Sequence, residues 1–210
     1  MSIVVAVVVG ITPAAHATPP AKPALKTWGA SGAVRAEVII GTTLYIGGSF
    51  TTVVSPDGLT TVNRRHLAAI DLTTGDLLPW APTTNGTVLA MVTDGTSLFL
   101  GGSFSVVNGV AQAHLAGVDL AGALLPWAAG ANATVSALHL NGTTLYVGGA
   151  FTTLGGAPRG YLGATTTSGE LLPWDPSAND RVRAITTLAS GEVVVGGFFT
   201  QVGGQAIDHI

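Results

Sequence analysis

A seven-residue motif occurs four times in this chain of 210 residues, and its spacing constrains the fold more than any other feature. The four copies, each apolar and each carrying a pair of glycines, are LYIGGSF (44–50), LFLGGSF (98–104), LYVGGAF (145–151) and VVVGGFF (193–199). A second marker, LLPW, ends at Trp80, Trp127 and Trp174, at two successive intervals of 47 residues. Because two different motifs recur at nearly the same interval along the chain, the sequence indicates a repeat protein.

Each repeat divides into four short apolar runs separated by turn residues. In the second repeat these runs cover 88–93, 97–102, 114–120 and 123–127. Asp94-Gly95 and Asn108-Gly109 lie between them, and such two-residue links are typical of β-hairpins. Four antiparallel strands in 47 residues make one β-propeller blade. No long run shows the 3.6-residue apolar period of a helix, so we predict an all-β propeller of four-stranded antiparallel blades.

The predicted propeller domain, 18–210, holds three complete blades and parts of others. The blades are expected at 33–80, 88–127 and 134–174, with a partial blade at 182–210. Trp28 stands where the tryptophan of a fourth strand belongs, ahead of the first complete blade. The chain therefore reads as an arc of a larger propeller, which would self-associate through its open ends. In the alternative, residues 22–28 pair with the last blade and close a four-bladed ring, which would be monomeric.

The glycine pair weakens a strand, so it must serve packing. Glycine at the end of the second strand permits a β-bulge or a positive φ, and it lets a neighbouring blade approach closely. The phenylalanine that follows can then turn into the space between blades, at Phe50, Phe104, Phe151 and Phe199. Burying such a ring contributes about 1.5–3 kcal/mol, which offsets the cost of the glycines.

Composition excludes several classes of function. The net charge is −3 and the eight basic residues are scattered, so no basic stripe could follow a nucleic-acid backbone. The chain has no cysteine, which removes disulfides and thiolate metal sites. The apolar run at 3–11 followed by AHA at 15–17 is typical of a secretory signal peptide, expected at 1–17. We therefore expect a secreted or cell-surface protein without a later membrane span.

The string LYVGGAFTTLGG, followed by LLPW, resembles the repeats of secreted actinobacterial β-propellers known as delta-sixty-type repeats. Similar units occur in the fungal cortical polarity-marker propellers, and a glycine pair after strand two with a tryptophan on strand four is distantly kelch-like. The resemblance covers roughly residues 25–210. It implies a propeller fold and an extracytoplasmic scaffold, often attached to further modules.

Two sets of residues recur at fixed blade positions. Trp80, Trp127 and Trp174 are expected to pack between blades, with exposed platforms for sugar rings as the alternative. His66, His114 and His209 share one position with Tyr161. Because tyrosine breaks a ring of metal ligands, we expect these side chains to bond the neighbouring backbone. His139 has no repeat partner and is expected in the core or the channel.

The carboxylates do not form a catalytic pair. Glu37 is the only acid on a first strand, whereas glycoside cleavage needs two converging acids. Asp71 and Asp119 precede turns and are expected to bond turn amides. No hydrolase, metalloprotease, P-loop or calcium-binding motif is present. We therefore expect no catalytic, cofactor-binding or metal-binding residue.

These features predict a non-enzymatic, exported propeller module for protein interaction or cell-surface structure. Its partner would be a protein or a surface polysaccharide. The first alternative is a carbohydrate-binding propeller, and the second is part of a propeller enzyme whose catalytic residues lie in other blades. A seven-residue insertion at 55–61 lengthens the first repeat. This loop, with Asp57, Arg64 and Arg65, is the expected contact with a partner. Asn85, Asn132 and Asn141 also match the N-glycosylation sequon.

Overall fold

The computed structural model describes residues 27–207, and every regular element in that range is a β-strand. The all-β prediction is therefore confirmed. No helix in this range is long and apolar enough to cross a membrane. The expected signal peptide at 1–17 and His209 lie outside the described residues.

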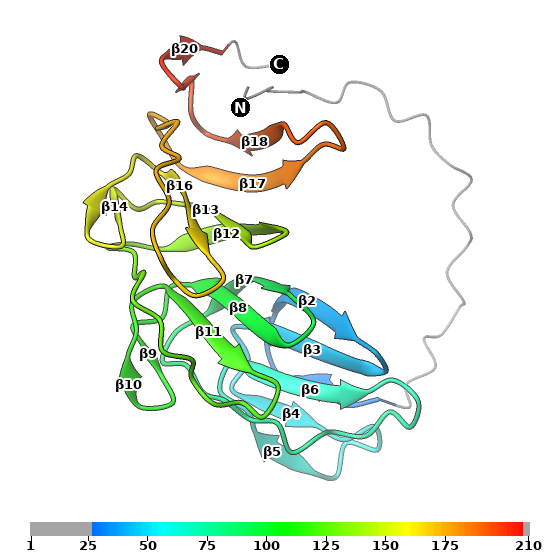
Figure 1. Ribbon diagram of the computed structural model, residues 1–210. Coiled ribbons are helices and arrows are strands. Elements are labelled where there is room, and N and C mark those ends of the chain that lie inside the picture. Colours follow the sequence, from blue (N-terminus) through cyan, green and yellow to red (C-terminus); the bar gives the residue numbers. More distant parts are fainter. Residues whose placement is uncertain (1–26, 208–210) are drawn as a thin grey trace.

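Four successive units each contain a small antiparallel sheet, whose second strand lies in the middle where three strands are present (Figure 1). The strands are β2 (Val34–Ile40), β3 (Thr43–Gly48) and β6 (Leu67–Asp71) in unit 1; β7 (Val88–Thr93), β8 (Ser97–Gly102) and β11 (Leu115–Asp119) in unit 2; β12 (Val135–Asn141), β13 (Thr144–Gly149) and β16 (Leu162–Thr166) in unit 3; and β17 (Val182–Thr187) and β18 (Val193–Gly197) in unit 4. The predicted first, second and third strands are thus found within one or two residues.

The prediction of four-stranded sheets is wrong. The LLPW segment pairs with the third strand through one isolated bridge in each complete unit, made by Leu77, Leu124 and Leu171. In unit 1 this bridge consists of two backbone hydrogen bonds, from the Leu78 N–H to the Ala69 carbonyl and from the Asp71 N–H to the Asp76 carbonyl, both at 2.9 Å. The next residue, Pro79, lies at a position whose nitrogen points away from β6, so a proline is tolerated at this outer edge of the sheet.

Short hairpins, which the sequence analysis did not predict, line one edge of the molecule (Figure 1). They are formed by β4 (Thr52–Val54) with β5 (Thr61–Asn63), β9 (Val106–Val107) with β10 (Val110–Ala111), β14 (Thr153–Leu154) with β15 (Ala157–Pro158), and β19 (Gln201–Val202) with β20 (Gln205–Ala206). Three of them are too short to show a strand pattern in the sequence, although the Asn108-Gly109 turn of one was identified.

The units pack through their first strands, which contact one another in the order β2, β7, β12 and β17. At the joint between units 1 and 2, one hydrophobic cluster contains Tyr45, Leu67 and Trp80 from unit 1 and Val88 and Leu98 from unit 2. Equivalent clusters lie at the next two joints. The core of the protein is therefore a series of layers between units.

The first glycine of each pair makes room for the next unit. A Cβ atom on Gly101 would lie 2.6 Å from the Cγ1 atom of Val135, closer than real Cβ contacts. The same contact recurs between Gly47 and Val88 at 2.7 Å and between Gly148 and Val182 at 2.6 Å. A valine on the first strand of one unit thus fits against a bare glycine of the unit before it. The close approach that the sequence predicted is confirmed.

The second glycine accommodates a bulge in its own sheet. The pairing register of β7 with β8 shifts between Val88 and Ala90, and a Cβ atom on Gly102 would collide with the carbonyl oxygen of Thr87. All four units have this bulge and this close carbonyl. Of the two predicted roles, the bulge is found, whereas no glycine of the four pairs has a positive φ.

The phenylalanine after each pair is buried, as predicted: Phe50, Phe104, Phe151 and Phe199 expose 5% of their surface or less. Phe104 belongs to the cluster at the joint between units 1 and 2. The glycine pair and the phenylalanine therefore act together: the bulge in the sheet and the close approach of the neighbouring unit enclose the phenylalanine ring.

The position predicted for Trp28 is wrong by two residues, and the segment around it belongs to unit 1. Strand β1 (Gly29–Ala30) pairs with β4, and Ala30 lies opposite Val53. The equivalent bridge in unit 2 joins Thr84 to Val107. Trp80 lies four residues before that bridge, whereas Trp28 lies two before it. Trp28 nevertheless packs on unit 1, and residues 22–26 of the segment that the alternative pairs with the last unit lie outside the described residues.

Candidate interaction site

The hairpin β4–β5 is longer than the other three. In units 1 to 3 a backbone hydrogen bond closes the hairpin, from the N–H at the shared histidine position to the carbonyl of the motif phenylalanine: His66 to Phe50, His114 to Phe104 and Tyr161 to Phe151. The bond spans sixteen residues in unit 1 and ten in units 2 and 3. Six of the seven extra residues therefore lie in this hairpin. The seventh lies in the turn after β6, where the Asp71 N–H donates to the Asp76 carbonyl, five residues on, whereas the equivalent Asp119 N–H donates to the Ala123 carbonyl, four residues on.

Asp57 orders the tip of this long hairpin. Its Oδ1 atom accepts hydrogen bonds from the Ser55 hydroxyl and, at 3.0 Å, from the Leu59 N–H. The Ser55 hydroxyl oxygen accepts from the Thr60 N–H at 2.9 Å. These bonds, above all the one from Ser55, hold the pKa of the Asp57 carboxyl below its ordinary value. Asp57 is therefore occupied in shaping its own loop.

The pKa of Asp57 gives the loop a defined dependence on pH. Because the pKa is lowered in the folded chain, the ionised carboxylate stabilises the loop above the ordinary value of 3.8. This stabilisation is lost as the pH falls through the lowered pKa. An acid titration by NMR should place the Asp57 midpoint below 3.8, and Ser55→Ala should raise it. An unchanged midpoint in the variant would exclude the Ser55 hydroxyl as the main cause.

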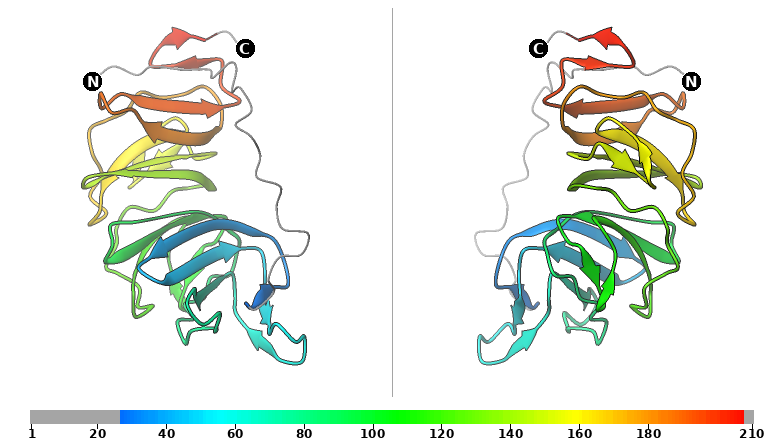
Figure 2. Two further views of the ribbon diagram at one scale, coloured as in Figure 1. Left: turned by 90° about the vertical axis from the view of Figure 1, so that its right-hand side faces the viewer. Right: turned by 90° about the vertical axis from the view of Figure 1, so that its left-hand side faces the viewer.

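Leu59 lies at the tip of the ordered loop with 86% of its surface exposed, more than any other large hydrophobic side chain of the described range. Figure 2 shows the β4–β5 hairpin projecting from the end of the molecule. At its base, the exposed Arg65 lines a hollow of about 430 Å³ together with His66 and Asn85 of the next unit's edge. The long hairpin therefore combines an exposed apolar tip with a cation at its foot.

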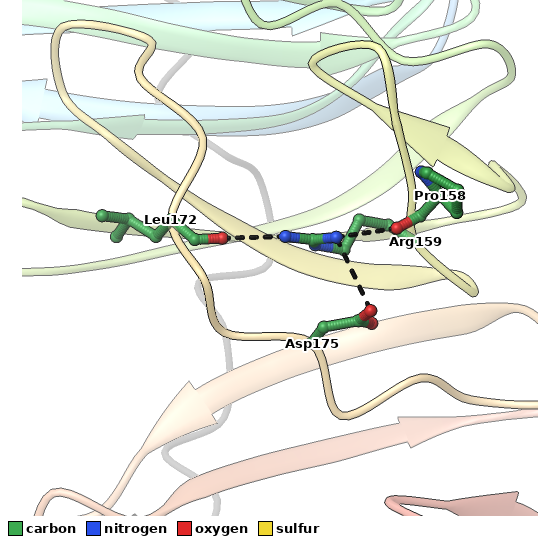
Figure 3. Close-up of polar contacts among 4 residues, drawn as sticks. All are labelled: Pro158, Arg159, Leu172 and Asp175. Carbon is green, nitrogen blue, oxygen red and sulfur yellow. Dashed lines mark hydrogen bonds and ion pairs between the residues drawn. The ribbon is translucent and has the colours of Figure 1, made fainter.

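Arg64, the third predicted contact residue, is used inside its own unit. Its guanidinium donates to the carbonyl of Leu78 and to that of Asn63, both at 3.0 Å. Arg159 makes the same pair of bonds in unit 3, to Leu172 at 3.1 Å and Pro158 at 2.8 Å (Figure 3). An additional ion pair of 3.6 Å joins Arg159 to Asp175.

These arginines thus tie the LLPW segment to the hairpin, where one bridge alone would hold it weakly. Burial lowers the pKa of Arg64, which fits a guanidinium partly enclosed by its own unit. Of the three predicted contact residues, only Arg65 is left with an exposed side chain that does not shape the loop or the sheet.

The histidine position bonds the backbone, as predicted. The Nδ1 atom of His66 donates to the Gly48 carbonyl at 3.1 Å, and that of His114 donates to the Gly102 carbonyl at 3.2 Å. His66, His114 and Tyr161 all have a positive φ, between 61° and 72°. This position therefore marks a strained corner between hairpin and third strand. Among the described residues, no three His, Cys, Asp or Glu side chains form a group that could hold a metal ion.

Trp80 and Trp127 pack between units, as predicted. They expose 7% and 8% of their surfaces. The indole N–H of Trp80 reaches the Asp119 carbonyl of unit 2 at 3.4 Å, and its ring meets Tyr45 edge to face at 4.9 Å between centroids. Trp174 meets Tyr146 in the same way at 5.0 Å but is only partly buried. The interpretation of Trp80 and Trp127 as sugar platforms is wrong, because neither ring has a free face.

Fluorescence quenching will separate these tryptophans. In variants that keep one tryptophan each, iodide should quench Trp174 more strongly than Trp80 or Trp127, because iodide reaches only exposed rings. Equal and strong quenching of all three would contradict the packing between units.

A polar ladder, which the sequence analysis missed, holds the hairpins of units 2 to 4 to the segments that precede these units. Asn85 accepts hydrogen bonds on Oδ1 from the N–H groups of Ser105 and Val106, at 2.8 and 2.9 Å. Its Nδ2 donates to the Ser105 hydroxyl at 2.9 Å. Asn132 and Asn179 make the same three bonds. Their spacing of 47 residues could have revealed the ladder. Two of these residues are sequon asparagines, so a glycan on either would break its bonds.

Asp71, Asp119 and His139 make local hydrogen bonds. The Asp71 carboxylate accepts from the N–H groups of Thr73 and Thr74, and Asp119 accepts from those of Ala121 and Ala123, as predicted for residues before turns. His139 Nε2 lies 2.9 Å from the Thr187 hydroxyl of the next unit. Glu37 is exposed on β2.

Comparisons with known proteins give a likeness of fold. No protein-family model and no curated protein matches the sequence. Among solved structures, 46 chains match. The crystal structure of the computationally designed Ika4 protein is 16% identical, with a TM-score of 0.50, over 80% of this chain and 92% of that one. The computationally designed Ika8 protein is 18% identical, with a TM-score of 0.47, over 80% of this chain and 46% of that one. The strands described above make this chain an all-β protein of repeated units, and the first likeness shows a fold shared with a designed protein.

Proposed function

We propose that the chain is an arc of a β-propeller and serves as a non-enzymatic, exported scaffold that binds a protein through the long β4–β5 hairpin. The successive antiparallel sheets, packed through their first strands, support blades as the repeating unit. The N-terminal apolar run and the resemblance to secreted propeller repeats support export.

The observation that carries this proposal is the exposure of Leu59 on an ordered loop. On a flexible loop, a leucine with 86% of its surface exposed would not by itself indicate a binding site. Here, however, Asp57 and Ser55 fix the loop before any partner arrives. A preformed loop loses less conformational entropy on binding, so its apolar tip contributes more to affinity. Loops held by a rigid scaffold are also where proteins most often place their contact residues.

The chemistry of the hairpin defines the partner it fits. Leu59 requires an apolar pocket, and Arg65 at the foot of the hairpin favours a carboxylate beside that pocket. The other hairpins lack this combination, because their turns have two residues, such as Asn108-Gly109. Unit 1 is therefore the recognition unit, and units 2 to 4 supply the rigid support.

Photo-crosslinking tests this function. A photoreactive phenylalanine analogue at residue 59 should give one discrete adduct with a protein of the source cell's surface or secreted fraction. The matched control places the analogue at Val110, which is 54% exposed on the two-residue hairpin of unit 2. Arg65→Glu should reduce the adduct at residue 59. Equal adducts from both positions, or none from residue 59, would contradict the proposal.

A further inference from the structure

Each joint between described units joins a valine to a glycine, and at each end of the row of units no described residue supplies the other half of that contact. At the first end the valine is Val34. Its equivalents Val88, Val135 and Val182 are fully buried at 0% exposure, whereas Val34 is 43% exposed. Beside it lies a hollow of about 540 Å³, lined by Glu37, Ile46 and Ile70.

At the other end the open half is Gly196. A Cβ atom there would meet only the Cβ of Ala184, at the ordinary contact distance of 3.8 Å. At the three internal joints the corresponding atom would lie 2.6–2.7 Å from a valine methyl. A hollow of about 220 Å³ lies over Gly196, Ala184 and Val194. Unit 4 thus has the bare glycine that receives a valine, and no described residue occupies it.

The charged residues of the two end faces are complementary. Val182 and Ile185 both contact the Gly148 position of the preceding unit. The equivalent pair in unit 1 is Val34 and Glu37, so the carboxylate would face the preceding unit. On the opposite face, Ser136 donates across its joint to the Val182 carbonyl at 2.8 Å. The equivalent residue in unit 4 is Arg183, which lies over the Phe198 ring at 5.1 Å.

We propose that two copies of this chain associate head to tail, with unit 1 of one copy packed on unit 4 of the other. Val34 of one copy fits against Gly196 of the other, as valines do against glycines at the three internal joints, and Glu37 pairs with Arg183. The interface is heterologous, so after two copies associate each still has one unpaired end face. Further copies can therefore add until the assembly closes into a ring. This inference does not depend on the proposed function of the hairpin.

The test measures the mass of the full chain by sedimentation across a range of concentrations. We expect defined multiples of 21.0 kDa that dissociate on dilution. Gly196→Val should not destabilise the single chain, but its side chain should fill the space over residue 196 that would receive Val34 of the other copy. The apparent dissociation constant should therefore rise at least about tenfold. The matched control is Ala111→Val, which adds a similar side chain on β10, away from both end faces. The apolar segment at 3–11 is present in every variant and cannot explain a difference between them.

A charge exchange identifies the interface. Glu37→Arg and Arg183→Glu should each weaken association, and the double variant should restore it. Circular dichroism should show unchanged strand content in all four proteins. A wild-type chain that stays monomeric would overturn the proposal and would indicate that something else, such as a further repeat, covers these faces. Association that resists both Gly196→Val and the charge reversals would overturn it as well, because a different surface would then be responsible.

Discussion

Replacing Phe104 with alanine should lower the free energy of unfolding by about 3–5 kcal/mol. The Phe104 ring is completely buried, in the cluster that joins units 1 and 2. Removing it leaves a cavity, and the surroundings cannot collapse to fill it. The backbone around it is fixed by the bond from the His114 N–H to the Phe104 carbonyl at 2.9 Å. Equilibrium unfolding in urea would measure the loss.

The matched control for this prediction is Phe198→Ala. Phe198 belongs to the last copy of the same motif but is 57% exposed. Its replacement should change the free energy of unfolding by about 0.5 kcal/mol or less. Similar losses for Phe104 and Phe198 would mean that the ring at position 104 is not held between units as described.

A series of glycine-to-alanine changes should give three distinct results. Gly102→Ala should destabilise most, by about 3 kcal/mol or more, because the new Cβ meets the rigid backbone carbonyl of Thr87. Gly101→Ala should cost about 1–3 kcal/mol, because its Cβ would lie 2.6 Å from the Val135 side chain and the two units must move apart. Urea unfolding again measures both.

Gly196→Ala is the internal control of the series. It changes the same motif position as Gly101→Ala, but its Cβ has only one neighbour, at 3.8 Å. The alanine should be neutral or should stabilise the chain by up to about 1 kcal/mol, because glycine costs entropy in a strand. Equal losses at Gly101 and Gly196 would show that the glycine serves its own sheet rather than the joint.

The repeat made most of the sheet structure predictable. Runs such as 97–102 and 193–197 combine apolar residues with glycine at fixed intervals, and the strands follow them closely. The fourth strand was overestimated because Leu-Leu-Trp is apolar enough for a strand. In the folded chain its ladder stops early, because the Leu78 carbonyl accepts from the Arg64 guanidinium rather than from the third strand. The hairpins were missed because two residues are too few to show an alternating pattern.

The site was predictable only in part, for a physical reason. The insertion stood out because it breaks the period, and its length placed it on a loop. Sequence could not show that Asp57 bonds within the loop, or that Arg64 reaches back to Leu78. Both contacts depend on where the chain returns in space. Arg159 at the equivalent position of unit 3 was the available indication that Arg64 has a structural role.

The contact of a valine with a bare glycine also bears on how a gene of this kind can change its length. Each contact involves only two successive units, as Gly101 with Val135 shows. Recombination between equivalent points of two repeats therefore adds or removes a whole unit and recreates the same contact at the seam. Recombination out of phase would place another side chain against the glycine, or a side chain where the glycine should be, and the product would fold poorly. The valine–glycine contact between units thus also determines which recombination products fold, and so keeps the repeat length constant as the number of units changes.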